Sequence, residues 1–417
     1  MISININSIA AVEEQLCDRC LGRLLGKFGH GYSNFTRGCA VRYALKNNIH
    51  TLNEDDIIQF SELGQKTTKE CIICKHLFDE VEKFAELVIE KLKDYDFNTF
   101  LIGSKVDKEI TDKEEELWKE LNLSYAEPIK TELNREVGKI VSSKLGKKVD
   151  FKAPEITAII DTRYDSIEIV PSPLFIFGRY RKLVRNIPQT KWPCKRCFGK
   201  GCEYCDFKGK IYATSVEEII ADRVMEITKG KEHKLHGLGR EDVDARVLGN
   251  GRPFILEITS PKRRIIDLAN VQCEINELGK SVVEVSQLRF TNFKEVVKIK
   301  QSKACKIYAV TIEFEKPISE QKIKELESRF SNLVIAQRTP LRVAHRRADK
   351  IRERKVLELR VESASPTSAR VSIKAEAGLY IKELITGDEG RTEPSIASQL
   401  GTKVQVLELD VIGVEYG

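Results

Sequence analysis

The amino-acid sequence predicts an α+β protein of more than one domain, with helices in its first half and mostly strands in its second. Its 417 residues exceed the usual size of a single domain. Apolar residues recur at helical spacing after Cys74 and again after Pro128, whereas runs rich in β-branched residues and bounded by turns fill most of the chain from residue 250 onward. Helices followed by a long series of strands indicate separate layers and not a repeated β-α unit.

The composition allows a buried core together with a highly charged surface, at 41% hydrophobic and 32% charged residues. No run approaches the roughly eighteen apolar residues of a membrane helix, and the first ten residues lack the pattern of a signal peptide. We therefore expect a cytoplasmic protein that is neither exported nor held in a membrane. Lys and Arg (69) exceed Asp and Glu (63) by only six, so binding to a polyanion must depend on local basic patches.

Eight of the eleven cysteines form CxxC pairs, which in a reducing compartment are typical of metal ligands. Disulfide bonds are the disfavoured alternative, and Cys39, Cys273 and Cys305 receive no role. Neither cluster offers an open coordination position beside a general base, so we expect structural zinc and no metal catalysis. The expected ligands of the first site are Cys17, Cys20, Cys71 and Cys74, and those of a compact second site, whose turns Gly199 and Gly201 permit, are Cys194, Cys197, Cys202 and Cys205.

The first half is expected to contain a metal-stapled segment followed by an α/β unit. Between Cys20 and Cys71 we expect a loop-rich segment in which the metal replaces a small core. Apolar periodicity then predicts helices over 77–92 and 129–145, the second ended by Gly146. Strands are expected at 156–160 and 166–170.

Two basic stretches are candidates for contact with nucleic acid. Residues 179–200 carry eight basic side chains and no acid, and Asn-Ile-Pro and Trp-Pro within them predict an extended loop. Residues 339–355 carry seven Lys or Arg against two acids. Guanidinium groups match phosphate oxygens, and two such stretches without helical periodicity favour nucleic-acid binding over two merely solvated faces.

The second half is predicted to be strand-rich. A helix begins after Ser215, since Ser215 and Glu218 have the spacing of a capping box. Another helix is expected over 323–330. The expected strands, in a mixed or antiparallel sheet, are 254–258, 282–290, 306–314, 356–361, 370–375 and 404–414.

Residues 236–254 could form an active-site loop, because they place two aspartates and three arginines among glycines just before a strand. Neighbouring arginines favour the ionised form of a carboxylate, which is the form of a nucleophile or base. A turn with exposed charges is the alternative. Tyr380 and Ile381 lie at an expected strand-to-helix junction, where they line a ligand site or belong to the core, and Tyr308 by its strand face is a core residue unless other information places it in a site.

Four segments together resemble the archaeal and eukaryotic tRNA pseudouridine(54/55) synthase family, often called the Pus-ten family. They are CDRCLGR with CIIC, GREDVDARVLGNGRPF, QRTPLRVAHRRAD and GLYIKELITGDEGRTEPS, in family order from about residue 14 to the last strand. The resemblance implies a catalytic domain of the pseudouridine synthase fold, with a mixed sheet, preceded by a zinc-containing, THUMP-like α/β accessory domain. The implied divisions are 1–80 (zinc-stapled segment), 81–178 (THUMP-like RNA-binding module) and 179–417 (catalytic domain, with a cysteine knuckle at 194–205 that departs from the family pattern).

The resemblance also implies roles for individual residues. GRED places the catalytic role on Asp242, with Asp244 as the competing choice, and Lys382 matches the basic residue that pairs with the catalytic carboxylate. Tyr308 matches a residue that packs against the target base, and Tyr380, Ile381 and Leu409 match the base pocket. The loops at 179–192 and 339–354 match forefinger and thumb loops that grip tRNA; their expected RNA contacts are Arg179, Arg181, Lys182, Arg185, Arg342, Arg346, Arg347, Arg352 and Arg354.

The implied activity is the isomerisation of uridine to pseudouridine at position 54, 55 or both in the TΨC arm of tRNA. The base would be flipped into a pocket, and no catalytic cofactor would be needed. The absence of Walker A and Rossmann patterns agrees with an enzyme without a nucleotide cofactor, and the expected partner is tRNA, bound by a monomer. Two rival classes are a non-catalytic zinc-containing tRNA-binding protein and another THUMP-containing tRNA modifier, such as a methyltransferase or thiouridine synthase.

Overall fold

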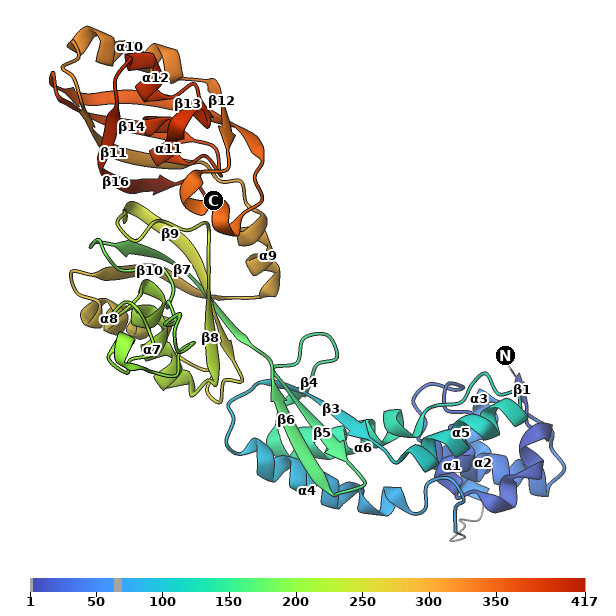
Figure 1. Cartoon of the computed structure of the whole chain (residues 1–417). Coiled ribbons are helices and arrows are strands. Elements are labelled where there is room, and N and C mark those ends of the chain that lie inside the picture. Colours follow the sequence, from blue (N-terminus) through green and yellow to red (C-terminus); the bar gives the residue numbers. More distant parts are fainter. Residues whose placement is uncertain (1–2, 64–69, 417) are drawn as a thin grey trace. The chain divides into compact units, whose positions relative to one another are not determined.

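The chain divides into two compact units, Met1–Ser172 and Pro173–Gly417, in a computed structural model that describes residues 3–63 and 70–416 (Figure 1). Unit 1 contains the expected zinc-stapled segment, 1–80, and all but the last six residues of the expected THUMP-like module, 81–178. The expected start of the last domain, residue 179, falls inside a strand of unit 2, β7 (Leu174–Lys182). Among the described residues, no helix is long and apolar enough to cross a membrane.

A four-stranded sheet and the helices beside it form one part of unit 1. The strand order is β4-β3-β5-β6, with β3 parallel to β4 and β5, and β6 antiparallel to β5. Buried residues of α4 and α6 pack with the inward-facing side chains of β3 and β5 in one core. The predicted helices and strands are confirmed here: the elements are α4 (Val81–Leu92), β3 (Thr99–Lys105), α5 (Lys108–Glu120), α6 (Ile129–Leu145), β4 (Lys148–Val149), β5 (Ile156–Asp161) and β6 (Ser166–Pro171).

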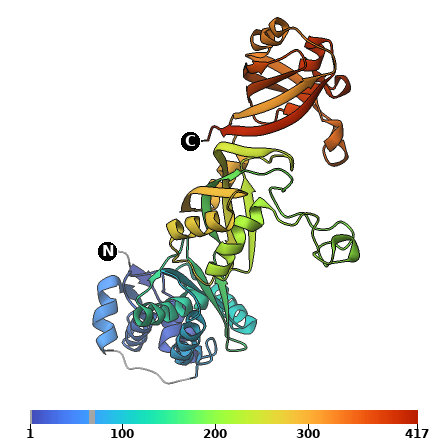
Figure 2. The ribbon, with the colours of Figure 1, turned by 90° about the vertical axis from the view of Figure 1, so that its left-hand side faces the viewer.

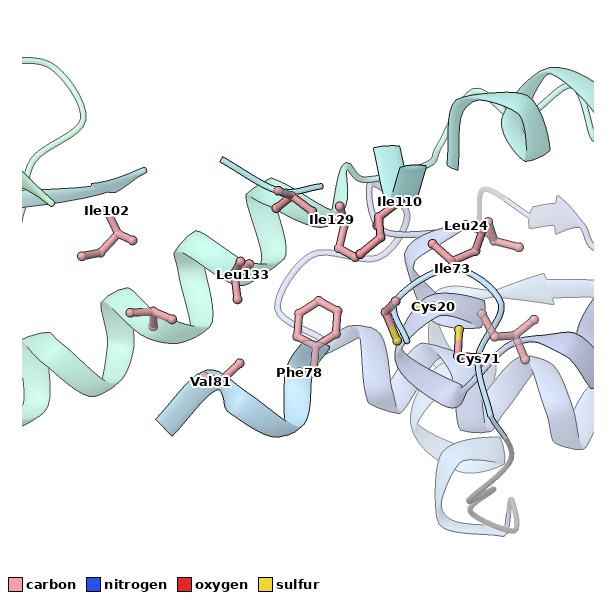
Figure 3. Packing of buried hydrophobic residues seen from close by; sticks show 14 of the residues in the cluster. Cys20, Leu24, Cys71, Ile73, Phe78, Val81, Ile102, Ile110, Ile129 and Leu133 are labelled. Atoms are coloured by element: carbon pink, nitrogen blue, oxygen red, sulfur yellow. The ribbon is translucent and has the colours of Figure 1, made fainter. Parts of the chain in front are cut away.

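The segment between the first two cysteine pairs is helical, so the expectation of a loop-rich segment is wrong. It contains the second half of α1 (Asp18–Arg23) and all of α2 (Asn34–Lys46) and α3 (Glu54–Leu63). Between α2 and α3 lies β2 (Thr51–Asn53), which pairs with β1 (Ser3–Asn5). Helices α1 and α2 touch through glycine: a Cβ on Gly22 would lie 1.7 Å from the Asn34 carbonyl oxygen. Phe78 continues this core from the cysteines toward Leu133 of α6 (Figure 3).

Buried arginines explain why this segment looked loop-like in sequence. The guanidinium of Arg37 donates to the carbonyls of Phe28, Gly29 and Tyr32. Arg42 pairs with the buried carboxylate of Asp18 at 2.8 Å. Both guanidinium groups of α2 are therefore hydrogen-bonded within the fold, and their charge did not reveal that this helix is largely buried.

Unit 2 is built on ten described strands in one mixed sheet, as the sequence predicts. The order is β10-β7-β9-β16-β11-β14-β13-β12-β15, with β8 paired to β9. Neighbouring strands are antiparallel except at the centre, where β9 and β16 are parallel and Arg246 lies opposite Asp410. The strands are β7, β8 (Glu232–Gly237), β9 (Arg246–Thr259), β10 (Val283–Thr291), β11 (Lys306–Phe314), β12 (Leu333–Arg338), β13 (Ile351–Ala364), β14 (Ser368–Ala375), β15 (Thr392–Glu393) and β16 (Val404–Val414).

Two hydrophobic cores cover the two halves of this sheet. One lies among β7, β9 and β10 with three helices, and the other among β11–β14 with three more. The predicted cap of α7 is confirmed, since Ser215 Oγ accepts from the Glu218 amide at 3.2 Å. The helices are α7 (Val216–Thr228), α8 (Leu268–Leu278) and α9 (Phe293–Gln301) in the first half and α10 (Glu320–Phe330), α11 (Ile381–Thr386) and α12 (Ile396–Leu400) in the second.

Both basic stretches are more ordered than the sequence indicates. Residues 179–182 belong to β7 and are not part of an extended loop. The second stretch contains a 3-10 turn (Leu341–Arg346), and its end, from residue 351, is the start of β13. In both places Arg and Lys stand among the strand-forming residues, although β7 is buried along nearly its whole length, so charge hid both strands.

Candidate active site

A short loop, residues 238–245, connects β8 to β9 near the centre of the sheet. A buried lysine donates hydrogen bonds to its backbone. Lys182 on β7 has no exposed surface, and its ammonium donates to the carbonyl oxygens of Ile187 at 2.9 Å, Asp242 at 3.3 Å and Val243 at 3.0 Å. Burial lowers the pKa of Lys182. We refer to residues 238–245 as the carboxylate loop.

A second buried group fixes the same loop from inside. The carboxylate of Glu241 accepts from the Tyr180 hydroxyl at 2.8 Å and pairs with Arg252 Nε at 2.9 Å. Arg252 Nη1 also donates to the Leu238 carbonyl at 2.7 Å, and Gln189 donates to the carbonyl of Gly239 at 3.1 Å. Burial, and next the charge of Glu241, raise the pKa of Tyr180, which remains a neutral donor. These contacts fix the backbone of the carboxylate loop without using the side chain of Asp242.

Asp242 and Asp244 lie on either side of one lysine. Lys382 Nζ is 3.4 Å from Asp242 Oδ2 and 2.8 Å from Asp244 Oδ2. Burial raises the pKa of Asp244, but the hydrogen bond and charge of the Lys382 ammonium outweigh it, so the pKa is lowered. The carboxylate of Asp242 is 37% exposed and that of Asp244 is 60% exposed. The expected pairing partner of the catalytic carboxylate thus contacts both aspartates and is closer to Asp244.

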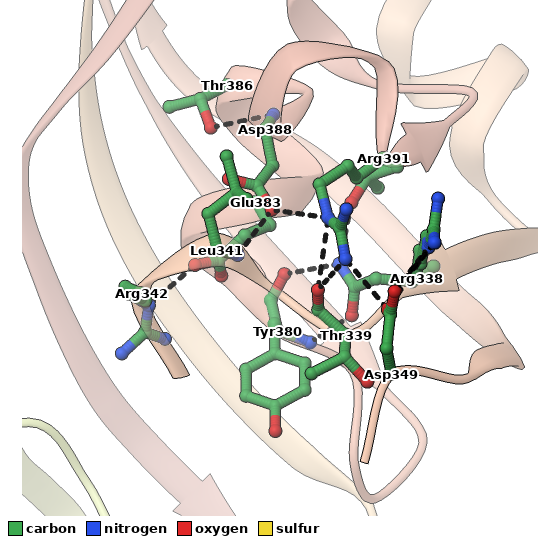
Figure 4. A network of polar contacts seen from close by, with 12 residues as sticks. Arg338, Thr339, Leu341, Arg342, Asp349, Tyr380, Glu383, Thr386, Asp388 and Arg391 are labelled. Atoms are coloured by element: carbon green, nitrogen blue, oxygen red, sulfur yellow. Dashed lines mark hydrogen bonds and ion pairs between the residues drawn. The ribbon is translucent and has the colours of Figure 1, made fainter. Parts of the chain in front are cut away.

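An arginine of the second basic stretch also reaches Asp242. Arg342 Nη1 lies 3.1 Å from Asp242 Oδ1, while its Nε lies 2.5 Å from Oε1 of the buried Glu383 on α11. Although burial opposes it, these two carboxylates raise the pKa of Arg342. The stretch is anchored further by Arg391, which donates to the Thr339 carbonyl and pairs with Asp349 at 2.8 Å (Figure 4).

One cavity of about 300 Å³ gathers most of the predicted pocket residues. Asp242 lines it, and Asp244 is not among the lining residues. The apolar and aromatic side chains expected from the resemblance are all present in its wall, together with several cations: Tyr308, Tyr380, Ile381, Leu409, Arg240, Arg252, Lys306, Arg342, Arg347 and Lys382.

The two tyrosines are positioned by backbone contacts. The register of β11 against β16 shifts between Ile307 and Tyr308, and such a bulge re-aims a side chain. Gln337 holds Tyr380 through both of its main-chain polar groups, at 2.8 and 3.0 Å. The buried Tyr380 hydroxyl has no hydrogen-bond partner among the described residues, and the ring points away from the polar network of Figure 4. An unsatisfied buried hydroxyl is ready to bond a ligand.

The predicted RNA-contacting residues separate into inward and outward groups. Arg179 is buried and donates to the main-chain carbonyls of Gly251 and Tyr416, and Lys182 is buried beneath the carboxylate loop. These two stabilise the fold, so the expectation that they contact RNA is withdrawn. Arg185 bridges Asp410 and the Asp244 carbonyl.

Outward positions remain for the other arginines. Arg181 pairs with the exposed Glu284, and Arg347 lies 5.9 Å from the centre of the Tyr380 ring. Arg352 and Arg354 are half-buried on β13, where Arg352 donates to Thr339 Oγ1 at 2.9 Å. The side chain of Arg346 lies outside the described part of the structure.

Each predicted set of four cysteines converges. Within each set all four sulfurs lie within 4.8 Å of one another. The Sγ atoms of Cys17 and Cys74 are 3.7 Å apart, and those of Cys194 and Cys202 are 3.9 Å apart. Four sulfurs about 2.3 Å from a tetrahedral zinc lie about 3.8 Å apart, so both sets fit zinc, and neither contains a disulfide.

Several residues of the site were missed by the sequence analysis. Glu241, Arg252 and Gln189 form the support of the carboxylate loop, and Lys306 lines the cavity although it lies at the start of a strand. The first three sit in segments already singled out, but only the fold pairs β7 with β9 and brings them together. Lys306 follows Cys305 two residues before Tyr308, with no motif to mark it.

Lys306 provides a stability prediction. Burial, and next the charge of Arg252, lower its pKa to about 8, whereas a lysine in the unfolded chain titrates near 10.4. Between these pH values the unfolded chain binds more protons, so the stability of unit 2 rises with pH through this window, and the cost of the buried charge is full below pH 8. Lys306→Met should therefore raise the free energy of unfolding at pH 7 by roughly 1–3 kcal/mol.

Urea denaturation of wild type and variant at pH 7 and pH 9.5, followed through the unit 2 transition, measures this effect. We expect the difference between the two proteins to shrink at the higher pH. A less stable variant, or an equal pH slope in both proteins, would contradict the assignment of a strained buried ammonium.

Comparison with known proteins identifies the class that this arrangement belongs to. A family model described as "Pus10, C-terminal" matches residues 175–415, and one described as "Pus10 THUMP domain, archaeal" matches residues 84–161. A THUMP domain with a pseudouridine synthase catalytic domain defines a tRNA-modifying isomerase. Both rival classes considered from sequence are thereby set aside.

Curated relatives match over nearly the whole chain. tRNA pseudouridine synthase Pus10 of Methanopyrus kandleri is 40% identical over 413 residues, covering 95% of this chain and 94% of the relative. The proteins of the same name from Methanocaldococcus jannaschii and Methanothermobacter marburgensis are each 42% identical, covering 96% of this chain and 92% and 96% of theirs. The chain belongs to the Pus10 family of tRNA pseudouridine synthases, which confirms the resemblance inferred from its motifs.

Among solved structures, a chain in the crystal structure of a Cbf5-Nop10-Gar1 complex is 18% identical with a TM-score of 0.32, covering 57% of this chain and 48% of that one. A similarity at this level is too low to support an argument.

Proposed function

We propose that this enzyme converts uridine to pseudouridine at position 54, 55 or both in the TΨC arm of tRNA, acting as a monomer with Asp242 as its catalytic carboxylate. The observation that carries the proposal is the shared cavity: Asp242, the cation of Lys382 and the predicted base-pocket residues Tyr308 and Leu409 line one space. Asp244 is the weaker candidate because it lies outside that lining and is more exposed.

The reaction exchanges one bond within a single nucleotide. The bond from C1′ of the ribose to N1 of uracil breaks, the freed uracil rotates, and a bond from C1′ to C5 forms. The proton on C5 leaves and one is gained at N1, so that no atom is added or lost. No redox partner or group donor is required, which is consistent with an enzyme that uses no catalytic cofactor.

Residues of the cavity divide these tasks. Asp242 promotes the departure of uracil, either by attack at C1′ or by removal of a sugar proton, and Lys382 and Arg342 place two cations beside this carboxylate. Ile381 and Leu409 supply an apolar wall that excludes water from the cleaved intermediate. Tyr308 and the unpartnered hydroxyl of Tyr380 orient the base. The two cysteine sets hold structural zinc, which supplies no step of the reaction.

The test is the formation of pseudouridine in an unmodified tRNA transcript incubated with purified protein and no added cofactor. Chemical mapping locates the product, and transcripts with cytidine at 54 or at 55 separate the two positions. Pseudouridine in the TΨC arm is expected. Product only elsewhere in the tRNA would overturn the position, and no product from a folded, tRNA-binding protein would overturn the activity.

Lys382 offers a prediction within this proposal. Lys382→Met removes the cation that faces both aspartates, and we expect kcat to fall about 100-fold with little change in the Kd for tRNA, since the loss is of charge at the reacting centre. Lys382→Arg keeps the charge and should recover most of the rate. Single-turnover measurements at saturating tRNA check this, and a Lys382→Met enzyme within threefold of wild type would rule out the role.

A further inference from the structure

The second cysteine set carries an exposed aromatic surface that the proposed reaction does not use. We propose that this knuckle, residues 194–209, stacks unpaired bases of the RNA substrate on its aromatic rings; the inference rests on tRNA as the partner. Three rings stand out from the small fold: Phe198 is 84% exposed, Tyr204 is 61% exposed and Phe207 is 74% exposed.

The backbone presents two of these rings at a conformational cost. Phe198 has a φ of 51° and Phe207 a φ of 59°, in the left-handed region that bulky side chains avoid. A knuckle built only to hold metal could place glycine or asparagine there, as it places Gly199 and Gly201 at neighbouring positive-φ positions. Strained, exposed aromatics held by a rigid support are typical of a binding surface.

The four cysteines supply that rigidity. Backbone amides of Gly201 and Gly209 donate to the sulfurs of Cys197 and Cys205, at 3.2 and 3.3 Å. Glycine is required at residue 209, because a Cβ there would lie 2.3 Å from the Gly199 carbonyl oxygen. The loops that carry Phe198 and Phe207 are therefore tied to the sulfur cluster and to each other, so the rings are displayed with little entropy left to lose on binding.

Charge around the rings favours RNA over an apolar partner. Residues 191–210 contain six Lys or Arg and two acids. Four thiolates around one zinc contribute a net charge of about −2. The positive charge that remains on the knuckle is therefore modest, and the rings must provide much of the affinity for RNA. The Cζ atom of Arg196 lies 4.1 Å from the centre of the Tyr204 ring, which adds a planar cation to this aromatic surface. Interleaved rings and cations are the usual platform for single-stranded nucleic acid.

The knuckle is joined directly to the reaction cavity. Its two arms pair through the amide of Ile211 and the carbonyl of Trp192 at 3.0 Å, and Trp192 packs edge-on to Tyr212. Trp192 also lines the cavity and lies 5.2 Å from the Cζ of Arg240, two residues before Asp242. Cys194 is only two residues further, a span of about 7 Å. In Figure 2 this green segment extends outward from the strands of its unit. Nucleotides flanking a base in the cavity can thus reach the rings.

The test measures binding of an unmodified tRNA transcript by the full-length, zinc-loaded protein. Phe198→Leu and Phe207→Leu keep an apolar side chain and the same backbone constraint but remove the ring. We expect each to weaken binding about fivefold and the pair together about 20-fold or more, with unchanged salt dependence because no charge is removed. The zinc content of each variant should equal that of the wild type, which shows that the cysteine set is intact.

Phe293→Leu is the matched control, since this ring is 61% exposed on α9 and away from the knuckle. A second measurement uses Phe198→Trp, whose emission should be quenched by tRNA and by a single-stranded RNA oligonucleotide but not by an RNA duplex of equal length. A double leucine variant that binds within twofold of wild type, or tryptophan emission unaffected by RNA, would overturn the proposal. Because binding is measured without turnover, failure of the proposed catalytic reaction would leave this result standing.

Discussion

Asp242→Asn is expected to abolish pseudouridine formation, with a fall of about 10⁴- to 10⁶-fold in single-turnover rate, the scale on which enzymes lose activity with their essential reacting group. The substitution keeps the size of the side chain and removes its charge. The carboxylate loop should stay in place, because it is held through Lys182, Glu241 and Arg252, none of which contacts the Asp242 side chain. Affinity for tRNA should therefore change little.

Asp244→Asn is the matched control. It lies two residues away, contacts the same lysine, and removes the same charge from outside the cavity lining. We expect at most about tenfold loss of rate, through altered placement of Lys382. Equal loss in the two variants would mean that the pair acts as a unit, and activity that survives in Asp242→Asn but not in Asp244→Asn would transfer the catalytic role to Asp244.

Cys71→Ser should unfold the part of unit 1 around the first cysteine set. Its side chain is buried, in the same core as Phe78 and Leu21. Structural zinc sites contribute apparent free energies of about 10–16 kcal/mol to folding, far more than a single core contact. Loss of one thiolate ligand should therefore lower the unfolding temperature by well over 10 °C and release about one zinc per chain.

Calorimetry and zinc analysis measure both effects. Cys273→Ser is the control, because Cys273 is exposed on α8 and should leave stability and zinc content unchanged. Chelator treatment of the wild type should release about two zinc ions per chain and should also cause the loss of unit 1 stability seen in Cys71→Ser. A Cys71→Ser protein with two zinc ions and an unchanged transition would show that the first set does not hold metal.

Local patterns predicted much of unit 2. Strands such as 306–314 and 404–414 have bounds that agree with β11 and β16, because their β-branched positions and turn residues act within a few residues of sequence. The cap at Ser215 and the two convergent cysteine sets were predictable for the same reason.

Nonlocal contacts were not predictable in this way. Arg179 and Lys182 were expected to bind phosphate, yet their charged groups donate to main-chain carbonyls, most of which belong to residues about sixty or more positions later. Nothing in the sequence distinguishes a carbonyl from a phosphate as the acceptor. Glu241 and Arg252 lie near the predicted carboxylate in sequence without a signal that they pair, since their contact depends on how the carboxylate loop folds between β8 and β9. Motif resemblance pointed to residues that line the cavity, and it did not point to those that support them.

The parallel pairing of β9 with β16 fixes how the two sides of the cavity are aligned along the strands. The carboxylate loop enters β9 at Arg246, and Leu409 precedes Asp410 on β16. The register of Arg246 against Asp410 therefore sets how far Asp242 lies from the part of the cavity wall that Leu409 forms. A slip of one residue would shift the strands by about 3.3 Å and turn Leu409 to the opposite face of the sheet. Asp410 is locked by Arg246 at 2.7 Å and Arg185 at 2.9 Å. The Asp410 carboxylate, which lies outside the cavity, thus helps to set the distance between Asp242 and Leu409 inside it.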